Sequence, residues 1–208
     1  MYLKITMKMK SIILKVVLAI AIIILGYMVV DSIMQPVRFE NEKAKRDEVV
    51  IELLKNIRDV QVAYKGINNV YINSFDTLID FVVSGQLPVV NIIPDPTDTT
   101  FSRTINDTTG YISVGESIFK DFSNLDPASI EYIPFSNGKK FKMAADVIEI
   151  NKVRVPVFEI SAEYKDILYG MEEQLILNLI RKLKEFEKFP GLKVGSLTEA
   201  STDGNWEF

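Results

Sequence analysis

Acidic side chains are the residues of this chain best suited to act in catalysis. The sequence contains no cysteine and no histidine, which excludes thiolate nucleophiles, imidazole general bases and the usual zinc-ligand sets. Asp146, Glu149 and Glu159 lie on two neighbouring segments with strand patterning, and paired carboxylates are what glycoside hydrolysis requires. The same residues are typical of the polar face of a half-exposed strand pair. We favour this second interpretation, and expect no enzyme, no catalytic residue, no cofactor and no metal site.

The distribution of charge separates the first thirty residues from the rest of the chain. Lys4, Lys8, Lys10 and Lys15 precede or enter an apolar run, and the first acidic residue is Asp31. Beyond residue 30 the chain carries 20 basic and 28 acidic residues, a net charge of −8. Such an acidic domain is a poor partner for nucleic acid. We therefore expect protein partners or self-assembly, and no nucleic-acid partner.

A membrane-spanning helix is predicted for residues 12–30. The segment reads IILKVVLAIAIIILGYMVV, and its only charge is Lys15, one turn from the start. At 1.5 Å per residue this segment spans about 28 Å, close to the ~30 Å hydrocarbon core of a bilayer. A cleaved signal peptide is the alternative, but the run is too long for one and no small-residue cleavage site follows it. We therefore expect the lipid bilayer to be a permanent partner.

The flanks of this segment suggest its orientation. Lys8, Lys10 and Lys15 are clustered at the N-terminal end of the apolar segment, and Asp31 directly follows its C-terminal end. The total numbers of basic residues near the two ends are nearly equal. We expect a single-pass protein of the inner (cytoplasmic) membrane with its N-terminus inside. Residues 1–11 would be a cytoplasmic tail, residues 31–48 a charged stalk, and residues 49–208 a periplasmic, or otherwise extracytoplasmic, α+β domain.

An apolar stripe at alternating three- and four-residue steps predicts a helix that ends near Gly66 and Asn68–Asn69. Its members are Val50, Leu53, Ile57, Val60 and Tyr64. The stripe could pack on the sheet of its own domain or form an intermolecular seam. About two heptads is short for a coiled coil, so we favour packing within the domain.

The other elements follow from local signals. Pro36 predicts a break or kink. Ser74 is placed to cap a short helix that stops at Gly85, and the Pro-, Asp- and Thr-rich segment 91–110 predicts a loop. Strand patterning covers residues 129–135, 139–150 and 153–160, which predicts an antiparallel meander with Pro156 on an edge strand. Residues 171–188 predict an amphipathic helix, with a strand through LILNLI as the alternative.

A family resemblance extends this picture. Residues 44–82 read AKRDEVVIELLKNIRDVQVAYKGINNVYINSFDTLIDFV. They resemble the region after the membrane helix of type II secretion major pseudopilins and type IV pilins, where an amphipathic helix leads to an A-Y-x-x-x-x-G-x-Y-P-like turn and a short Leu-containing helix. The corresponding residues here are Ala63–Tyr64, Asn69–Val70–Tyr71 and Leu78. The resemblance implies a pilin-like fold: a helical stalk on a small antiparallel sheet, with a further helix near the C-terminus.

The chain also departs from the pilin pattern. Its apolar segment lacks the Gly that precedes the cleavage point of pilin-like precursors and the Glu five residues into the mature helix. The overall layout, especially the ending GLKVGSLTEASTDGNWEF, is similar to a group of single-pass membrane proteins of the phylum Bacteroidota. That similarity implies no particular activity.

A short repeated pattern fits the same bacteria. Asp followed by Ser or Thr, and then by an apolar residue or Thr, resembles their O-glycan acceptor motif. Within the predicted loop it occurs at Asp98–Thr99–Thr100 and at Asp107–Thr108–Thr109. Thr99 and Thr108 are therefore candidate glycan acceptors, since a bulky sugar is accommodated most easily in a loop.

These observations favour a non-catalytic, pseudopilin-like role as a structural or assembly component of a cell-envelope machine. The alternative is an envelope binding module, or an accessory alignment subunit of a secretion- or pilus-type complex. Oligomeric state distinguishes the two hypotheses.

Overall fold

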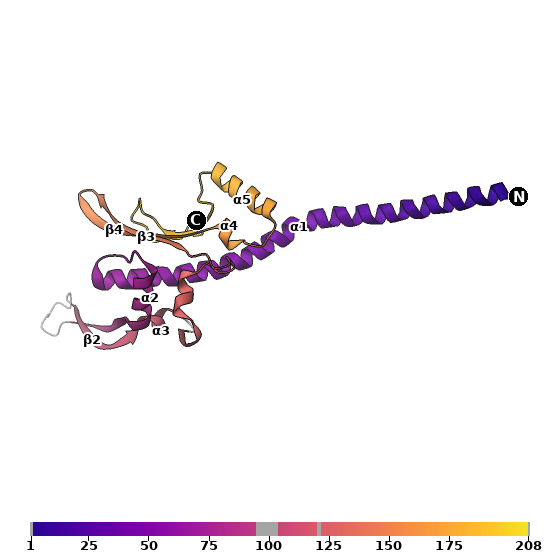
Figure 1. Ribbon diagram of the computed structural model, residues 1–208. Coiled ribbons are helices and arrows are strands. Elements are labelled where there is room, and N and C mark those ends of the chain that lie inside the picture. Colours follow the sequence, from indigo (N-terminus) through magenta and orange to yellow (C-terminus); the bar gives the residue numbers. More distant parts are fainter. Residues whose placement is uncertain (1, 95–103, 120–121, 208) are drawn as a thin grey trace. The chain divides into compact units, whose positions relative to one another are not determined.

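The computed structural model describes residues 2–94, 104–119 and 122–207. They form helices and small antiparallel sheets (Figure 1), so the predicted mixture of helix and sheet is confirmed. The chain divides into two compact units, Met1–Ala44 and Lys45–Phe208. Helix α1, Tyr2–Asn68, contributes to both units.

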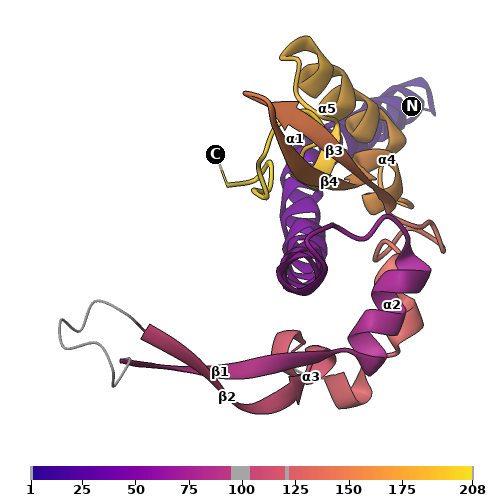
Figure 2. The ribbon, with the colours of Figure 1, turned by 90° about the vertical axis from the view of Figure 1, so that its left-hand side faces the viewer.

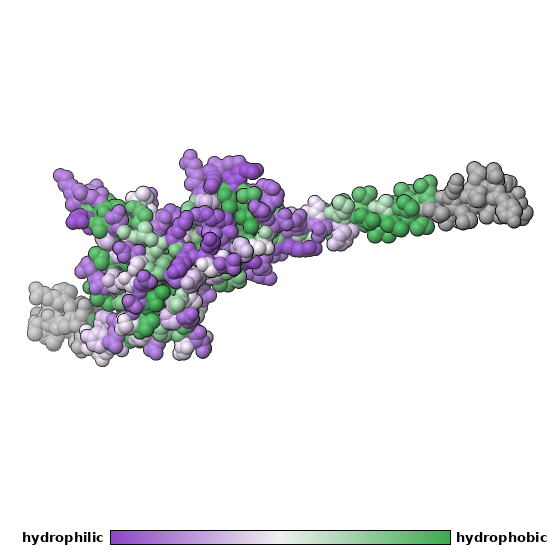
Figure 3. Space-filling view, viewed as in Figure 1, coloured by the Kyte–Doolittle hydropathy of each residue, from purple (hydrophilic) through white to green (hydrophobic). Residues whose placement is uncertain are grey.

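The first unit contains the apolar part of α1. None of the side chains in its most apolar 18-residue stretch is buried, and Ile23 and Tyr27 expose 71 % and 72 % of their surface. Figure 3 shows this stretch as a continuous hydrophobic surface. Within the described residues, α1 is the one helix that is long and apolar enough to cross a membrane. An apolar helix without protein cover matches a lipid environment better than an aqueous one.

Of the predicted break or kink at Pro36, the break is wrong, because α1 continues through this residue. A proline inside a helix lacks the N–H that would bond to the carbonyl of residue 32, and its ring crowds that carbonyl. The other hydrogen bonds of the ladder remain on both sides. In a helix this long they hold the backbone helical in spite of the local loss.

In the second unit, α1 presents a buried face that differs from the predicted stripe. Side chains that are completely buried on this face belong to Val50, Leu54, Ile57, Val60 and Gln61. Leu53 and Tyr64, which the sequence placed in the stripe, are half-buried. Leu54 and Gln61 follow Val50 and Ile57 at four-residue steps, so the centre of the buried face is rotated towards them. The helix ends as predicted: Asn69 adopts a left-handed conformation (φ 61°), and its N–H donates to the Lys65 carbonyl at 2.8 Å.

Helix α2, Phe75–Ser84, begins and ends where the sequence predicts. The Ser74 hydroxyl accepts a hydrogen bond from the Thr77 backbone N–H at 3.4 Å, and the Gly85 N–H donates to the Phe81 carbonyl at 2.8 Å. One face of α2 is buried through Leu78 and Val82. The Phe81 ring meets the Tyr64 ring of α1 edge-on, with centroids 5.1 Å apart.

The predicted loop at 91–110 is wrong for its described ends. Strands β1, Gln86–Pro94, and β2, Thr104–Ser113, pair antiparallel across this region, and α3, Val114–Ile118, follows. The flanking LPVVNII and TGYI are rich in β-branched and aromatic residues, which favour strands. Backbone pairing then continues into the polar residues, because the ladder does not depend on their side chains. Residues 95–103 lie outside the described part of the chain.

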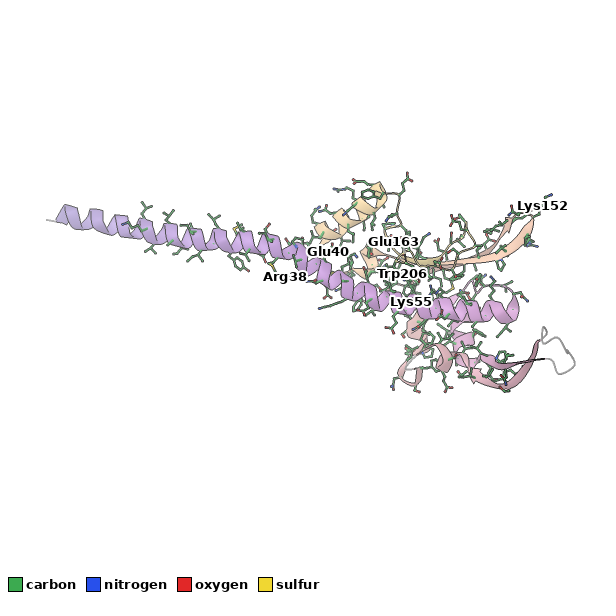
Figure 4. All side chains as sticks on the ribbon, turned by 180° about the vertical axis from the view of Figure 1, so that it is seen from behind. Arg38, Glu40, Lys55, Lys152, Glu163 and Trp206 are labelled. Atoms are coloured by element: carbon green, nitrogen blue, oxygen red, sulfur yellow. The ribbon has the colours of Figure 1, made fainter. Side chains whose placement is uncertain are left out.

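The main sheet has three strands in the order β3-β4-β5. Strands β3, Lys142–Ile150, and β4, Val153–Glu163, form the predicted antiparallel pair. Asn151 and Lys152 connect them with positive φ angles of 52° and 66°, which a tight two-residue hairpin turn requires. Figure 4 shows Lys152 at the tip of this hairpin. Strand β5, Gly191–Gly195, pairs with β4 from Glu159 to Glu163 and was not predicted.

Two details of the predicted meander are wrong. Residues 129–135 form no strand; a 3₁₀ helix at Pro127–Glu131 replaces it, preceded by another at Phe122–Asn124. Asp126 accepts from the Ala128 N–H at 3.1 Å and Pro127 fits the first helical position, so capping outweighs the apolar alternation. Strand β4 is central and not an edge. Pro156 is tolerated because β5 pairs only with later residues of β4.

Two helices follow β4. Helix α4, Tyr164–Ile167, is short, and α5, Glu173–Glu185, is the predicted amphipathic helix. Arg46 of α1 holds the end of α4: its Nη1 donates to the carbonyls of Ile167 and Tyr169 at 3.2 and 2.9 Å. Its guanidinium also lies over the Phe135 ring, 5.1 Å from the centroid. A cation at the C-terminal end of a helix satisfies carbonyls that have no partner within the helix.

The core of the second unit lies between α1 and the main sheet. Figure 2, seen along α1, shows the main sheet on one side of α1 and the β1–β2 pair on another. Completely or almost completely buried residues of the sheet are Val157, Phe158, Ile160, Ala162, Leu192 and Val194. The Tyr71 ring packs on Phe158 at 4.6 Å between centroids. Gly191 permits the close approach of β5, because a Cβ there would lie 2.1 Å from the Ala162 carbonyl oxygen.

The rotated face of α1 can be tested with two neighbouring leucines. Leu54→Ala should lower the free energy of unfolding by about 2–5 kcal/mol, the usual range for truncating a buried leucine. Leu53→Ala should cost clearly less, because Leu53 is half-buried. Urea unfolding of the full chain in detergent, followed by fluorescence of the single tryptophan, Trp206, measures both values. An equal or larger cost at Leu53 would restore the stripe predicted from the sequence.

Candidate functional site

The β1–β2 ribbon, residues 86–94 and 104–113, is the part of the second unit that packing of the core explains least. Its strands pair only with each other, with one register shift between Val89 and Val90. None of its side chains that the structure describes, at residues 86–91 and 108–113, is buried. A two-stranded ribbon by itself is marginally stable in water.

Both faces of the ribbon expose apolar side chains. On one face Val89, 46 % exposed, lies beside Ile112, 40 % exposed; their register partners are Gly110 and Leu87. The opposite face carries Val90 and Tyr111, 41 % and 69 % exposed. Cross-strand partners share a face, so apolar groups line both sides near the base of the ribbon. A ribbon that rested on its own core would show this pattern on one side only.

The two strands differ at their outer edges. β1 contains Pro88 and Pro94, which have no N–H to offer a further strand, whereas β2 contains no proline, lysine or arginine. Asp107 is the only charged residue among the 19 residues of the two strands. The edge of β2 therefore lacks the prolines and lysines that often prevent a strand from pairing with another chain, and its protective features are Asp107 and the extra residue Thr109 at the register shift.

The base of the ribbon is held firmly. The Val114 N–H donates to the Gly85 carbonyl at 3.1 Å, which closes the ribbon between α2 and α3. Val114 is completely buried, and Gly115 lies directly against Phe122: a Cβ at Gly115 would be 2.4 Å from its ring. The ribbon thus emerges from a packed junction.

This junction is attached to α1 through Gln61. The side chain of Gln61 is completely buried, and its Nε2 donates to the Ile72 carbonyl at 2.8 Å. Its Oε1 accepts from the Ile72 N–H, also at 2.8 Å. A side-chain amide therefore pairs with the backbone N–H and C=O of one residue, as a residue of a neighbouring antiparallel strand would. Ile72 precedes the cap residue Ser74, so the pair fixes the start of α2 and, through it, the ribbon. Sequence analysis missed Gln61 because an apolar stripe gives no signal for a buried amide.

The carboxylates considered for glycoside hydrolysis do not converge. Glu159 pairs with Lys193, with 2.9 Å between its Oε2 and Nζ. In the register of β3 and β4, Glu159 lies opposite Ala144, so it shares a face with Asp146. Glu149 lies three residues after Asp146 on β3. Because this number is odd, its side chain points to the other face of the sheet. The three residues are therefore divided between two faces.

The candidate glycan acceptors have different surroundings from those predicted. Thr108 is exposed, but it lies in β2 opposite Val90 instead of in a loop. Thr99 lies outside the described residues.

Two hollows in the second unit are weaker candidates. A cleft of about 210 Å³ lies between α1 and the C-terminal segment, with Asp47, Tyr164 and Trp206 in its lining. The Trp206 Nε1 has no hydrogen-bond partner among the described residues, but the protein itself covers this atom, so a ligand in the cleft could not reach it. A larger hollow of about 480 Å³ is lined by α5 residues alone. Since one helix supplies its whole lining, this hollow is the side of a helix and not an enclosed binding pocket.

Electrostatic contacts support the sheet next to α4. Glu163, at the end of β4, contacts Lys142 of β3 and Lys165 of α4. The hydrogen bond from Lys142, followed by that from Lys165, lowers the pKa of Glu163 from 4.5 to about 2. Glu207 accepts from Arg58 of α1 at 2.8 Å, and this hydrogen bond lowers the pKa of Glu207. Glu163 and Trp206 are labelled in Figure 4.

Comparison of the chain with protein-family models, curated proteins and solved structures finds no match.

The Gln61 contact leads to a direct prediction. Gln61→Leu keeps the size of the side chain but leaves the buried N–H and C=O of Ile72 without partners. We expect a loss of about 2–5 kcal/mol of unfolding free energy, since each unpaired buried group costs about 1–3 kcal/mol. Gln174→Leu, at an exposed position of α5, should change stability by no more than about 0.5 kcal/mol. Chemical denaturation measured through Trp206 compares the variants, and a loss equal to that of the control would contradict the role of Gln61.

The ion pairs of Glu163 predict a specific pH dependence. The folded pKa of about 2 lies below the ordinary value of 4.5. The pairs therefore stabilise the fold fully above pH 4.5, and their contribution is lost as the pH falls towards 2. Glu163→Gln should flatten this acid-side loss relative to the parent chain, while Glu149→Gln, at an exposed position of β3, serves as the control. Unfolding curves at several pH values check this, and parallel profiles for the parent and Glu163→Gln would contradict it.

Proposed function

We propose that the protein is a single-pass, non-catalytic component of a cell-envelope assembly, anchored in the inner membrane by residues 12–30. Residues 1–11 would lie in the cytoplasm, and the domain at 49–208 outside it. The observation that carries the proposal is the apolar part of α1, whose most apolar 18 residues have no protein cover. Exposed apolar side chains have a lower free energy in lipid than in water.

The second unit supports an assembly role. It presents a ribbon with apolar groups on both faces and a strand edge without proline or lysine. Surfaces of this kind are typical of protein–protein contacts. A pseudopilin-like role agrees with a long N-terminal helix whose later part buries one face within an α+β unit. The missing Gly and Glu of pilin precursors lead us to propose the assembly role without that processing step.

An accessory or binding role is the second candidate. The same strand edge could accept an extended segment of another envelope protein by β-augmentation, which uses backbone hydrogen bonds for affinity. The two candidates differ in the identity of the occupant: a second copy of this chain or a different protein.

Extraction from membranes tests the anchor. The full chain should remain in the pellet after alkaline carbonate treatment, because residues 12–30 are expected to span the bilayer. Ile20→Asp combined with Ile24→Asp should release a large fraction, since each central charge costs about 2.5–3.5 kcal/mol of insertion free energy. Val153→Asp, at an exposed apolar position of the second unit, is the control and should remain in the pellet. Release of the parent chain would contradict the anchor.

Thiol labelling in the same membranes tests the orientation. The chain contains no cysteine, so a single introduced thiol gives an unambiguous signal. Asn137→Cys, in an exposed turn, should react with an impermeant maleimide once the outer envelope is opened. Lys8→Cys should be protected until the inner membrane is dissolved. The reverse pattern would invert the proposed topology.

A further inference from the structure

We propose that β2 is a self-association edge: two copies of the chain pair their β2 strands antiparallel and join their ribbons into one four-stranded sheet. The strand order would be β1-β2 of one copy followed by β2-β1 of the other. This inference rests on the proposed assembly function and names the partner.

The exposed apolar groups show that the ribbon is incomplete in a single copy. Val89 and Ile112 on one face, and Val90 and Tyr111 on the other, are each at least 40 % exposed. A ribbon of two strands gains stability when further strands supply backbone partners and cross-strand neighbours. Pairing of two ribbons places more side chains beside one another on both faces at once.

The composition of the strands selects β2 as the joining edge. The prolines of β1, Pro88 and Pro94, remove donors from its ladder. β2 retains a backbone N–H at every residue from Thr104 to Ser113. It also lacks the lysines that natural edge strands use against unwanted pairing.

The distribution of charge favours a second copy as the occupant. Residues 45–208 contain 18 basic and 25 acidic residues, so two copies repel one another over most of their surfaces. The ribbon is the exception, with Asp107 as its only charge. Two ribbons can therefore approach at little electrostatic cost. An antiparallel pair of identical strands is isologous, so each copy offers the donors and acceptors that the other requires.

Confinement to a membrane assists this pairing. Molecules held in one bilayer meet at a much higher effective concentration than molecules free in solution. A short strand edge that would be too weak to dimerise in dilute solution can then be occupied. The self-association therefore depends on the anchor that the proposed function supplies.

Cross-linking of the full chain in membranes tests the inference. Thr108→Cys places the only thiol near the middle of β2, where the two strands would cross. A flexible bis-maleimide should then give covalent dimers. Tyr169→Cys, at a position 55 % exposed after α4, should give several-fold fewer dimers at the same protein-to-lipid ratio. Equal yields from the two positions would overturn the proposal.

A charge substitution provides the second measurement. If Thr109 of one copy pairs with Thr109 of the other, position 111 of one copy lies opposite Asp107 of the other. Tyr111→Asp, added to Thr108→Cys, should therefore give several-fold fewer cross-linked dimers in membranes, because like charges on neighbouring strands repel. Tyr169→Asp should leave the dimer intact. The unfolding midpoint, read from Trp206, should stay the same in both variants, which separates loss of pairing from loss of fold.

The outcomes are distinguishable from a failure of the proposed function. A parent chain that is monomeric by mass in detergent, together with a Thr108→Cys variant that gives no covalent dimer in membranes, overturns self-association. If that monomer remains in the carbonate pellet and cross-links through Thr108→Cys to a different protein, the edge serves a heterologous partner and the assembly role stands. Release of the parent chain by carbonate would instead overturn the membrane anchor itself.

Discussion

The paired hydrogen bonds between the Gln61 amide and the backbone N–H and C=O of Ile72 connect the two parts of the second unit. One part is α1 with the main sheet, and the other is α2 with the ribbon. Gln61 is completely buried among apolar residues, where an unpaired amide would be costly. Ile72 is 2 % exposed, so water cannot replace the side chain as its partner. The contact therefore fixes where the chain turns after α1, and Tyr71, Ser74 and α2 take their positions from that turn.

Around this contact the sheet is completed by residues distant in sequence. β5 approaches β4 closely because Gly191 and Gly195 have no Cβ to meet the backbone of Ala162 and Phe158. The C-terminal segment then returns to α1, where Glu207 accepts from Arg58. Gly204 lies directly against the Trp206 indole, with no room for a Cβ between them. Ion pairs such as that of Glu163 add to this arrangement, but solvent limits their contribution, because Lys142 and Lys165 are largely exposed.

The sequence was sufficient where a local signal decided the structure. The Ser74 cap, the Asn151–Lys152 turn and the amphipathic α5 all follow from side chains acting within a few residues. It was insufficient where tertiary contacts decided. Segment 129–135 has strand patterning, but its first three residues belong to a capped 3₁₀ helix, and β5 is a strand only because β4 provides a partner. For the candidate site, the sequence predicted neither strand: segment 91–110 was interpreted as a loop because it is rich in Pro, Asp and Thr.

The ribbon differs from these elements because the core does not require it. Buried side chains of the second unit come from α1, α2, β4, β5 and the segments between them, and none comes from the described side chains of the ribbon. A polar sequence would serve equally well if the ribbon only connected α2 to α3. The apolar residues on both faces, the single charge and the β2 edge without proline or lysine would each be a cost to an isolated acidic domain. They support our proposal that another chain adds to the sheet at the edge of β2. The proposed membrane anchor would hold copies of the chain close together, so a second copy would be the partner met most often.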